Sequence, residues 1–250
     1  MLPNLEELVK TLDIRVFKVP TQTSEVDRVS LLRLQNLVAD ACPGYRYLEI
    51  GSHLGGSIFP HLVDARCASI VSVDPRPPSQ PDERGQTFDY EENSSARMMD
   101  VLSEVLGASA ANKVHTIDRD ITEVAPADTG RGVHLVLIDA EHTNRAAFRD
   151  FARALRMIER DAIIAFHDSN LLVDALWNIE EFLSFIGQPH RGFYLLDQVY
   201  AVALGNMVDP ATAKLGPCCL DRESFYLSSK SSLWRMIAVG ERGANEFLPG

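Results

Sequence analysis

The sequence predicts an α/β fold with a mostly parallel β-sheet, and three observations lead to this prediction. Short apolar runs with the composition of buried strands alternate with helical patterns along the chain. One of these runs, Tyr45–Ile50, stops at Gly51, where a loop with three glycines leads into a helical pattern near Ser57. Two late runs, at residues 193–196 and 199–204, are separated by two residues, which is too short for a parallel crossover and predicts an antiparallel hairpin.

The remaining elements follow from the same patterns. Helical spacing predicts helices at residues 24–40, 57–66, 93–106, 143–158 and 172–186, and apolar runs predict strands at 69–73, 114–117, 133–138 and 161–166. Residues 75–92 contain four prolines and few apolar side chains, so we expect a long mobile loop that serves as a lid or substrate loop. We expect residues 1–22 to form an N-terminal cap, residues 23–205 the main domain, and residues 206–250 an extension packed on it, with a strand-like piece at 225–227.

Composition and charge limit the functions that the chain can serve. With 250 residues and 46% hydrophobic content, the chain can bury roughly three quarters of its unfolded surface in one domain. A net charge of -11 argues against nucleic acid or an anionic membrane as the main partner and favours a small-molecule substrate. Residues 1–10 show no signal pattern, and no apolar run approaches the ~18 residues of a membrane helix, so we expect a cytoplasmic protein. The four cysteines lack the paired spacing of a zinc site, and the sequence leaves open whether the chain forms a homo-oligomer.

The loop after the first strand has the features of a ligand site. Gly51, Gly55 and Gly56 can adopt backbone angles closed to other residues, so a ligand can lie against the main chain where a helix presents its free N–H groups. Their spacing differs from the G-x-G-x-x-G pattern of dinucleotide-binding folds. Glu49, two residues before the first glycine, would repel a pyrophosphate and favour a ligand with an ammonium or sulfonium group.

Polar residues follow each predicted strand, and ligands of open α/β sheets bind outside the carboxyl ends of the strands. Asp74 follows the second strand, where it can accept hydrogen bonds from both hydroxyls of a ribose or instead cap a turn before Pro75. The other polar residues at these strand ends are Asp118, Asp120, Asp139, His142, His167 and Asp168. If the fourth and fifth strands are neighbours, about 4.8 Å apart, Asp139 and Asp168 can converge on one point. Two close carboxylates repel each other unless a proton or cation lies between them, so the pair favours a divalent ion.

Three segments carry a resemblance to a known family: Leu48-Glu-Ile-Gly51 with Gly55-Gly-Ser57, Ile138-Asp-Ala-Glu-His-Thr143, and Phe166-His-Asp-Ser169. Together they resemble the class I S-adenosylmethionine-dependent methyltransferases, in particular the type 24 family, which is related to metal-assisted sugar and catechol O-methyltransferases. The resemblance implies a Rossmann-like, seven-stranded, mostly parallel sheet that ends in the antiparallel hairpin. It also implies that S-adenosylmethionine is bound by Glu49, Gly51, Ser52, Gly55, Ser57, Asp74, Asp120 and Asp139, with Asp74 on the ribose and Asp120, favoured over Asp118, on the adenine.

The same resemblance implies a metal-assisted reaction. Asp139 and Asp168 correspond to the magnesium ligands of the metal-assisted relatives, and His142 is the candidate base for the acceptor's proton. The third ligand is open between His167, which we favour, and Asn170. We expect Mg²⁺ or Mn²⁺, but an imidazole ligand shifts the preference toward manganese, iron or zinc and leaves the identity of the ion open. Two alternatives stay open, because Asp168 could cap the following helix and His142 could be a turn histidine.

The function that we expect is methyl transfer from S-adenosylmethionine to a hydroxyl of a small molecule, such as a sugar or phenol of a natural product or glycan. A first alternative is an NAD(P)-dependent oxidoreductase, which the glycine spacing and the terminal hairpin disfavour. A second is a non-catalytic S-adenosylmethionine-binding partner protein, which the set of Asp139, His142 and Asp168 disfavours.

Overall fold

The computed structural model describes residues 4–107, 111–130 and 132–245. Residues 1–3 of the predicted N-terminal cap and residues 246–250 of the predicted extension lie outside this range. The main sheet has the order β10-β8-β9-β7-β6-β1-β2-β5. Its strands are β1 (Tyr45–Ile50), β2 (Cys67–Val73), β5 (Val114–Ile117), β6 (Val133–Ile138), β7 (Ile158–Phe166), β8 (His190–Leu195), β9 (Tyr200–Leu204) and β10 (Cys219–Leu220).

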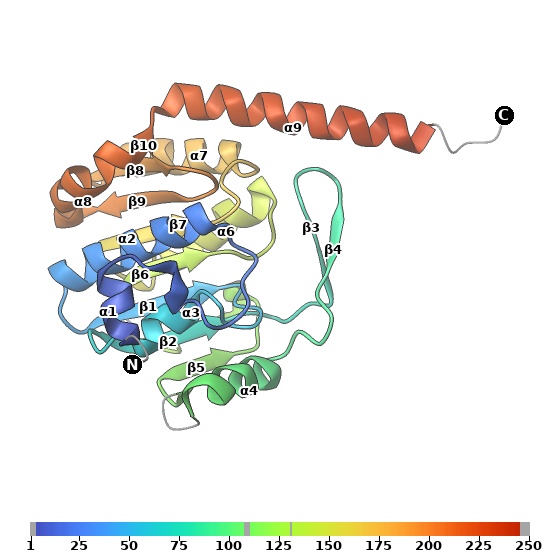
Figure 1. Cartoon of the computed structure of the whole chain (residues 1–250). Coiled ribbons are helices and arrows are strands. Elements are labelled where there is room, and N and C mark those ends of the chain that lie inside the picture. Colours follow the sequence, from blue (N-terminus) through green and yellow to red (C-terminus); the bar gives the residue numbers. More distant parts are fainter. Residues whose placement is uncertain (1–3, 108–110, 131, 246–250) are drawn as a thin grey trace.

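The central part of the sheet is parallel. Strands β5, β2, β1, β6 and β7 run in one direction, so their carboxyl ends lie along one edge, on the right-hand side of Figure 1. Strand β9 is antiparallel to both β7 and β8, which confirms the predicted hairpin. The sheet has one strand more than the predicted seven, because the two residues of β10 pair with the edge strand β8.

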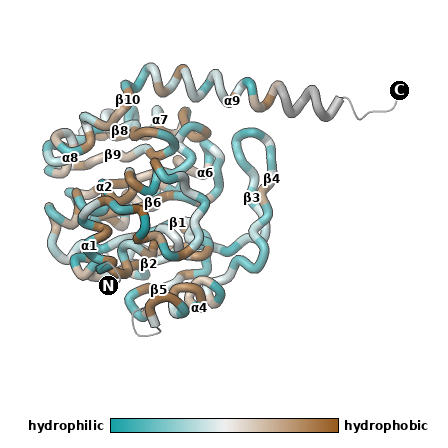
Figure 2. Tube along the Cα trace, viewed as in Figure 1, coloured by the Kyte–Doolittle hydropathy of each residue, from teal (hydrophilic) through white to brown (hydrophobic). Residues whose placement is uncertain are grey.

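Helices cover both faces of the sheet because side chains alternate between the faces along each strand. Tyr45 and Tyr47 point to one face, which is covered by α2 (Glu25–Ala41), α3 (Ile58–Val63), α4 (Ser95–Leu106) and α8 (Val208–Leu215). Leu48 and Ile50 point to the other face, which is covered by α6 (Asn144–Ala154), α7 (Val173–Phe185) and the first part of α9 (Arg222–Asn245). Short 3-10 helices lie at Ile14–Val16, Ile121–Glu123, Gly205–Met207 and Gly216–Cys218. The hydrophobic segments in Figure 2 accordingly gather between the layers.

The helix ends follow local sequence signals. Ser24 caps α2 by accepting a hydrogen bond from the backbone N–H of Asp27, whose side chain in turn accepts from the backbone N–H of Ser24. Thr143 caps α6 through the backbone N–H of Ala146, as the sequence predicts. Gly107 follows α4 with a positive φ of 82°, a conformation that glycine adopts without steric cost.

The segment 75–92 differs from the predicted loop, because it contains a two-stranded hairpin. Strands β3 (Ser79–Pro81) and β4 (Thr87–Asp89) are antiparallel and project from the body of the molecule (Figure 1). The carboxylate of Asp82 organises the turn, since it accepts hydrogen bonds from the backbone N–H groups of Arg84 and Gln86. Gly85 supplies the positive φ of 74° that the turn requires.

The predicted strand at 225–227 is wrong, because these residues lie in α9. Phe225, Ser229 and Leu233 are buried at a spacing of four residues, which is the spacing of one helix face. Helix α9 begins on the body of the molecule, and its C-terminal part extends beyond it (Figure 1). Among the described residues, no helix is both long and apolar enough to span a membrane.

The N-terminal segment packs beside the glycine loop. Helix α1 (Leu5–Lys10) and the turn around Val16 form a small apolar cluster with Leu32 of α2. Farther along, the chain crosses the loop so closely that a Cβ atom at Gly56 would lie 2.5 Å from the carbonyl oxygen of Pro20. Only glycine fits at position 56 while the N-terminal segment stays in this place.

Candidate active site

A cavity at the carboxyl edge of the parallel strands contains most of the predicted site residues. It has an empty volume of about 690 Å³, part of which is open to solvent. Its walls are Pro20, Thr21, Gln22, Gly51, Ser52, His53, Leu54, Gly56, Ser57, Asp74, Gln80, Tyr90, Asn93, Asp139, His142, His167 and Asp168. The glycine loop, the N-terminal segment, the hairpin region and the ends of β6 and β7 therefore meet at one place.

Gly51 is required by a close approach of two parallel strands. Its φ is 86°, and a Cβ atom there would lie 2.1 Å from the carbonyl oxygen of Asp139 at the end of β6. Gly55 also has a positive φ, of 80°, but it faces the Met98 side chain of α4 rather than the cavity. Of these two predicted cofactor-binding glycines, Gly51 lines the cavity and Gly55 supports the loop from behind.

Asp74 ties the glycine loop to the end of β2. Its Oδ2 atom accepts hydrogen bonds from the backbone N–H groups of Ser52 (3.0 Å) and His53 (3.2 Å), and Oδ1 accepts one from the backbone N–H of Arg76 (2.8 Å). The guanidinium of Arg76 lies 3.3 Å from Oδ2. Asp74 is buried at the cavity wall and holds the loop in shape. A carboxylate has about four acceptor positions, so these three hydrogen bonds leave about one, on Oδ1, for a ligand hydroxyl.

Glu49 and Ser57 form a pair beneath the loop. Glu49 is fully buried, and its carboxyl oxygens accept hydrogen bonds from the hydroxyls of Tyr47 (2.5 Å) and Ser57 (2.6 Å). Burial raises the pKa of Glu49 to about 8, so this group is largely protonated at neutral pH. Glu49 does not line the cavity, whereas Ser57 does. Contact between Glu49 and a cationic ligand therefore stays a prediction, and its electrostatic basis is weaker than the sequence indicates.

The two acids after β5 have separate partners. Asp120 caps the 3-10 helix at Ile121–Glu123 by accepting from the backbone and hydroxyl of Thr122, and it does not line the cavity. Asp118 accepts from the Ser95 hydroxyl (2.6 Å) and lies 3.7 Å from the Nε atom of Arg76, the neighbour of the loop. The preference for Asp120 as the adenine contact thus remains a prediction, with Asp118 as its alternative.

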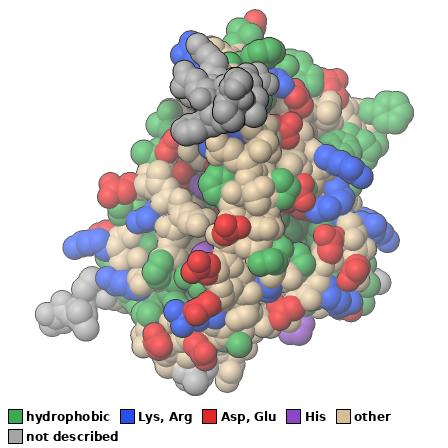
Figure 3. All heavy atoms as spheres, turned by 90° about the vertical axis from the view of Figure 1, so that its right-hand side faces the viewer, with side chains coloured by type: hydrophobic (Ala, Val, Ile, Leu, Met, Phe, Trp, Pro, Cys, Tyr) green, Lys and Arg blue, Asp and Glu red, His purple; other side chains and the backbone are tan. Residues whose placement is uncertain are grey.

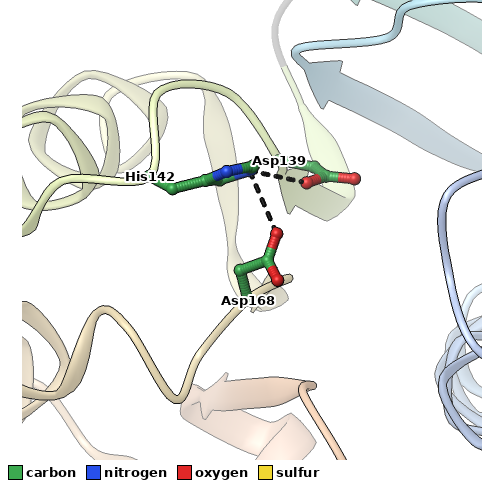
Figure 4. Close-up of side chains that lie close together, drawn as sticks. All are labelled: Asp139, His142 and Asp168. Carbon is green, nitrogen blue, oxygen red and sulfur yellow. Dashed lines mark hydrogen bonds and ion pairs between the residues drawn. The ribbon is translucent and has the colours of Figure 1, made fainter. Parts of the chain in front are cut away.

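The strongest feature of the cavity is a cluster of carboxylates and imidazoles at the ends of β6 and β7. The Nε2 atom of His142 lies 3.4 Å from Oδ1 of Asp139 and 3.2 Å from Oδ2 of Asp168 (Figure 4). The Nδ1 atom of His167 reaches the same two oxygens, at 3.4 Å and 3.3 Å. Parallel pairing of β6 with β7 brings the two segments together, as the sequence predicts. Asp168 adopts a positive φ of 49°, in the left-handed region that aspartate tolerates better than most residues.

The charges of the cluster reinforce one another. Burial alone would raise the pKa of Asp139, but His167 and His142 hold it well below its usual value. Burial alone would lower the pKa of His167, but the carboxylates of Asp139, Asp168 and Asp27 raise it well above its usual value. The pKa of His142 is raised in the same way, by Asp139 and Asp168 against the effect of burial. The carboxylates and imidazoles therefore favour each other's charged forms, whereas His167 disfavours the charged form of His142.

Sequence reasoning missed one member of this cluster, Asp27. It lies in the first turn of α2, with 1% of its surface exposed, and its Oδ2 atom is 3.3 Å from Nε2 of His167. The sequence shows Asp27 only as a residue suited to a helix cap, and nothing in it links this position to residue 167. The contact arises because the turn between β8 and β9 brings Gln198 against the start of α2.

The donor set fits a divalent cation. One ligand atom from each of Asp139, His142 and Asp168 lies within 4.8 Å of the others. Nδ1 of His167 reaches the same two carboxylate oxygens, so either imidazole could complete the set. Counting Asp27, the cluster has three carboxylates and two imidazoles, so a negative charge remains even when both imidazoles are protonated. Carboxylate oxygens with imidazole nitrogens suit Mn²⁺, Fe²⁺ or Zn²⁺, and carboxylates also suit Mg²⁺. Asn170, the alternative third ligand, does not line the cavity, whereas His167 does.

The chain is similar to known proteins in sequence and in fold. Residues 48–169 match a family model described as a methyltransferase domain. The cofactor-bound protein Rv0187 from MTB is similar in structure, with a TM-score of 0.53 and 16% identity over 81% of this chain and 89% of that chain. An O-methyltransferase from Bacillus cereus in complex with SAH has a TM-score of 0.48 and 13% identity over 82% of this chain and 92% of that chain. No curated protein matches the sequence.

The match in sequence covers β1 to the end of β7 and includes the glycine loop, Asp139, His142 and Asp168. The likeness to Rv0187 shows that the fold extends over most of the chain. Residues 48–169 of this protein thus match the methyltransferase domain, and the chain has the α/β fold of the class I S-adenosylmethionine-dependent methyltransferases.

Proposed function

We propose that this protein transfers the methyl group of S-adenosylmethionine to a hydroxyl group of a small molecule, with the assistance of a divalent cation. The observation that carries the proposal is the cluster of Asp139, His142, His167 and Asp168 in the same cavity as the glycine loop. A binding protein would need only the loop. Carboxylates and imidazoles beside it provide groups that can act on an acceptor hydroxyl.

The donor would lie against the glycine loop. Ser52 and His53 already present backbone N–H groups to Asp74, so the loop and the carboxylate form one rigid edge of the cavity. We propose that Asp74 accepts hydrogen bonds from the ribose hydroxyls there. Asp139 lies across the cavity wall from Asp74, at the end of the strand next to β1, which suits its predicted contact with the cofactor.

The acceptor would approach from the side of the hairpin and the N-terminal segment. Gln22, Gln80 and Asn93 line this side and can bind a polar molecule such as a sugar, while Tyr90 could stack on a sugar or phenol ring. Acidic side chains gather over the centre of this face, with basic side chains mostly at its margins (Figure 3). Such a surface would repel the phosphates of a nucleic acid.

Methyl transfer is an in-line displacement, so the protein must align donor and acceptor and remove the acceptor's proton. We propose that Asp139, Asp168 and His167 hold the cation and that His142 takes the proton. A bound divalent cation supplies Lewis-acid stabilisation of negative charge on an oxygen. The chain's own groups orient the acceptor, accept its proton and close the site between the loop and the hairpin.

Calorimetry with S-adenosylhomocysteine tests the function. We expect the wild-type protein to bind this product but not NAD⁺, and Asp74→Ala to weaken binding by roughly 1.5–3 kcal/mol, because it removes an acceptor for charged hydrogen bonds. Binding of NAD⁺ in place of the product would favour an oxidoreductase.

With radiolabelled donor and a panel of sugars and phenols, excess chelator should abolish transfer and leave product affinity intact. Full transfer in chelator, together with an absence of metal by elemental analysis, would remove the cation from the mechanism.

A further inference from the structure

Asp27 belongs to the N-terminal cap of α2 and also contacts His167 in the candidate active site. Its Oδ1 atom accepts a hydrogen bond from the backbone N–H of Gln198 (2.9 Å). Its Oδ2 atom accepts from the hydroxyl of Ser24 (2.9 Å), and Nε2 of His167 lies 3.3 Å away. Asp27 is 1% exposed and His167 is 4% exposed, so water has little access to this contact. Every partner of the carboxylate is therefore a group of the protein.

The contact determines how the imidazole of His167 is oriented. An ionised carboxylate only accepts hydrogen bonds, so the proton between Asp27 and His167 belongs to Nε2. In a neutral imidazole, the other nitrogen then carries the lone pair. That nitrogen, Nδ1, points at the gap between Asp139 and Asp168, with distances of 3.4 Å and 3.3 Å. Whenever His167 is neutral, as it must be to bind a cation, Asp27 thus selects the tautomer that presents an electron pair to the cluster.

We propose that Asp27 is a positioning residue of the active site, which holds His167 with Nε2–H toward α2 and with Nδ1 directed between Asp139 and Asp168. This inference rests on the proposed function, in which His167 is a ligand of the cation. A carboxylate behind a ligating imidazole fixes the orientation of the ring and increases its basicity as a ligand. Among the described residues, no carboxylate lies behind the imidazole of His142, since both of its carboxylate contacts are made through Nε2.

The substitution Asp27→Asn keeps one oxygen of the side chain and replaces the other with an NH₂ group. If its remaining oxygen faces Gln198, its NH₂ group points at Nε2 of His167 and forces that nitrogen to accept, which reverses the tautomer. If the oxygen faces His167, the NH₂ group points at the backbone N–H of Gln198, and two donors meet. Both orientations disturb the arrangement while the size of the side chain stays the same.

Ser24→Ala is the matched control. The hydroxyl of Ser24 lies 2.9 Å from the same Oδ2 atom and 2.5 Å from Oδ2 of Asp197, and it caps the same helix, but Ser24 makes no contact with His167. If Asp27 serves only to cap α2, Ser24→Ala should have the same consequences as Asp27→Asn. If Asp27 orients His167, the two variants should differ.

The first measurement is ¹⁵N NMR of the histidine side chains in the metal-free wild-type protein and in both variants. At a pH high enough for His167 to be neutral, we expect its single proton on Nε2 in the wild-type protein and in Ser24→Ala, and a smaller population of this tautomer in Asp27→Asn. An unprotonated Nε2 in the wild-type protein would overturn the proposal, and so would wild-type populations of the two tautomers together with a wild-type amide signal of Gln198 in Asp27→Asn. The wild-type spectrum keeps the test decisive even if the variant does not fold.

The second measurement is titration with Mn²⁺ by calorimetry, with S-adenosylhomocysteine affinity as the check on folding. We expect Asp27→Asn to bind Mn²⁺ about 10–100-fold more weakly than the wild-type protein, and Ser24→Ala to bind it nearly as well. Equal weakening in both variants, or none in either, would overturn the coupling of Asp27 to the site. Absence of Mn²⁺ binding by the wild-type protein would instead refute the cation in the proposed function, and the NMR result would still decide the role of Asp27.

Discussion

Glu49 shows how burial changes the pKa of a side chain. Burial raises its folded pKa to about 8, whereas an unfolded glutamate titrates near 4.5. Between these pH values the folded protein keeps a proton that the unfolded chain has lost. The free energy of unfolding should therefore fall as pH rises through this window, by up to about 1.4 kcal/mol per pH unit from this group.

The substitution Glu49→Gln should remove this pH dependence. Glutamine keeps partners for Tyr47 and Ser57 but has no charge to bury, so the variant should be more stable than the wild-type protein near pH 8. Urea denaturation at several pH values between 5 and 9 would measure the difference. The control is Glu104→Gln, which changes an exposed glutamate of α4 and should leave the wild-type pH profile in place. Parallel profiles for wild type and Glu49→Gln would show that Glu49 is ionised in the fold.

His142 is the residue whose loss should affect the chemical step most directly. His142→Ala should lower kcat by roughly 10²–10⁴-fold, because it removes the base while the donor site stays intact. The acidic limb of the pH–rate profile should disappear with it. His53→Asn is the control, since His53 lines the same cavity, its side chain makes no ion pair with Asp139 or Asp168, and its φ of 42° is one that asparagine tolerates. Wild-type turnover in His142→Ala would transfer the role of base to another group.

The residues of the cluster differ in how far the sequence could predict them. Asp139 and Asp168 each follow a strongly apolar strand, so their meeting at one edge follows from the parallel order of β6 and β7. Asp27 is remote in the chain, and its role depends on how the β8–β9 turn meets α2. Tertiary packing of that kind leaves no periodic signal in the sequence.

Among the elements, the β3–β4 hairpin has the closest link to the site. The backbone N–H of Glu83, in its turn, donates to the carbonyl oxygen of His142 (2.9 Å). The carboxylate of Glu83 accepts from the backbone N–H of Asn144 (2.8 Å), at the start of α6. The prolines of this segment indicated a loop, and the contacts that fold it back lie outside its own sequence. The hairpin is therefore fastened to the segment that carries the candidate base.

Loss of the Glu83 side chain should loosen this attachment. Glu83→Ala removes one hydrogen bond of the carboxylate to α6, worth about 1–2 kcal/mol, so exchange of the amides at residues 79–89 should speed up roughly 5–30-fold. Hydrogen exchange with mass spectrometry would measure this, and S-adenosylhomocysteine affinity should not change. Asp89→Ala, at an exposed position of β4, is the control. Equal exchange in the two variants would show that the hairpin is held by its backbone contacts alone.

Helix α9 shows why the secondary structure of one segment was mispredicted. The three consecutive apolar residues Phe225, Tyr226 and Leu227 resemble a short strand when they are considered without their neighbours in the sequence. Over a wider window, Phe225, Ser229 and Leu233 follow helical spacing, but a run of serines around Ser229 weakens the apolar signal. Burial against α7 decides the outcome, since Tyr226 packs on Trp177 at 5.3 Å between ring centroids.

At the scale of the whole molecule, the order of the strands explains why so much of the site was predictable. Five parallel strands end at one edge, and each polar residue that follows a strand is placed there by the topology. The sequence cannot give the distances across that edge, because they depend on which loops fold inward. Asp120 turns to cap its own short helix, whereas Asp74 turns to the glycine loop.

The C-terminal helix should divide into a part that stabilises the whole molecule and a part that does not. Phe225 and Leu233 belong to the core on the α6 and α7 side of the sheet, and Met236 and Ile237 pack against it. Each large apolar side chain that is buried there contributes about 1.5–3 kcal/mol, so deletion of residues 222–250 should lower the free energy of unfolding by several kcal/mol. Arg222 would also leave the face of Trp177, where its guanidinium lies 3.7 Å from the ring centroid.

Deletion of residues 239–250 should have a much smaller effect. Among the residues whose side chains are described, Ile237 is the last of α9 to contact the core. Beyond it, the helix extends past the body of the molecule (Figure 1). We expect this shorter deletion to change the free energy of unfolding by less than about 1 kcal/mol, in line with changes away from the core. Urea denaturation of the two truncated proteins beside the full chain would measure both effects. A large loss of stability in the shorter deletion, dependent on protein concentration, would mean that the projecting end packs against a second copy of the chain.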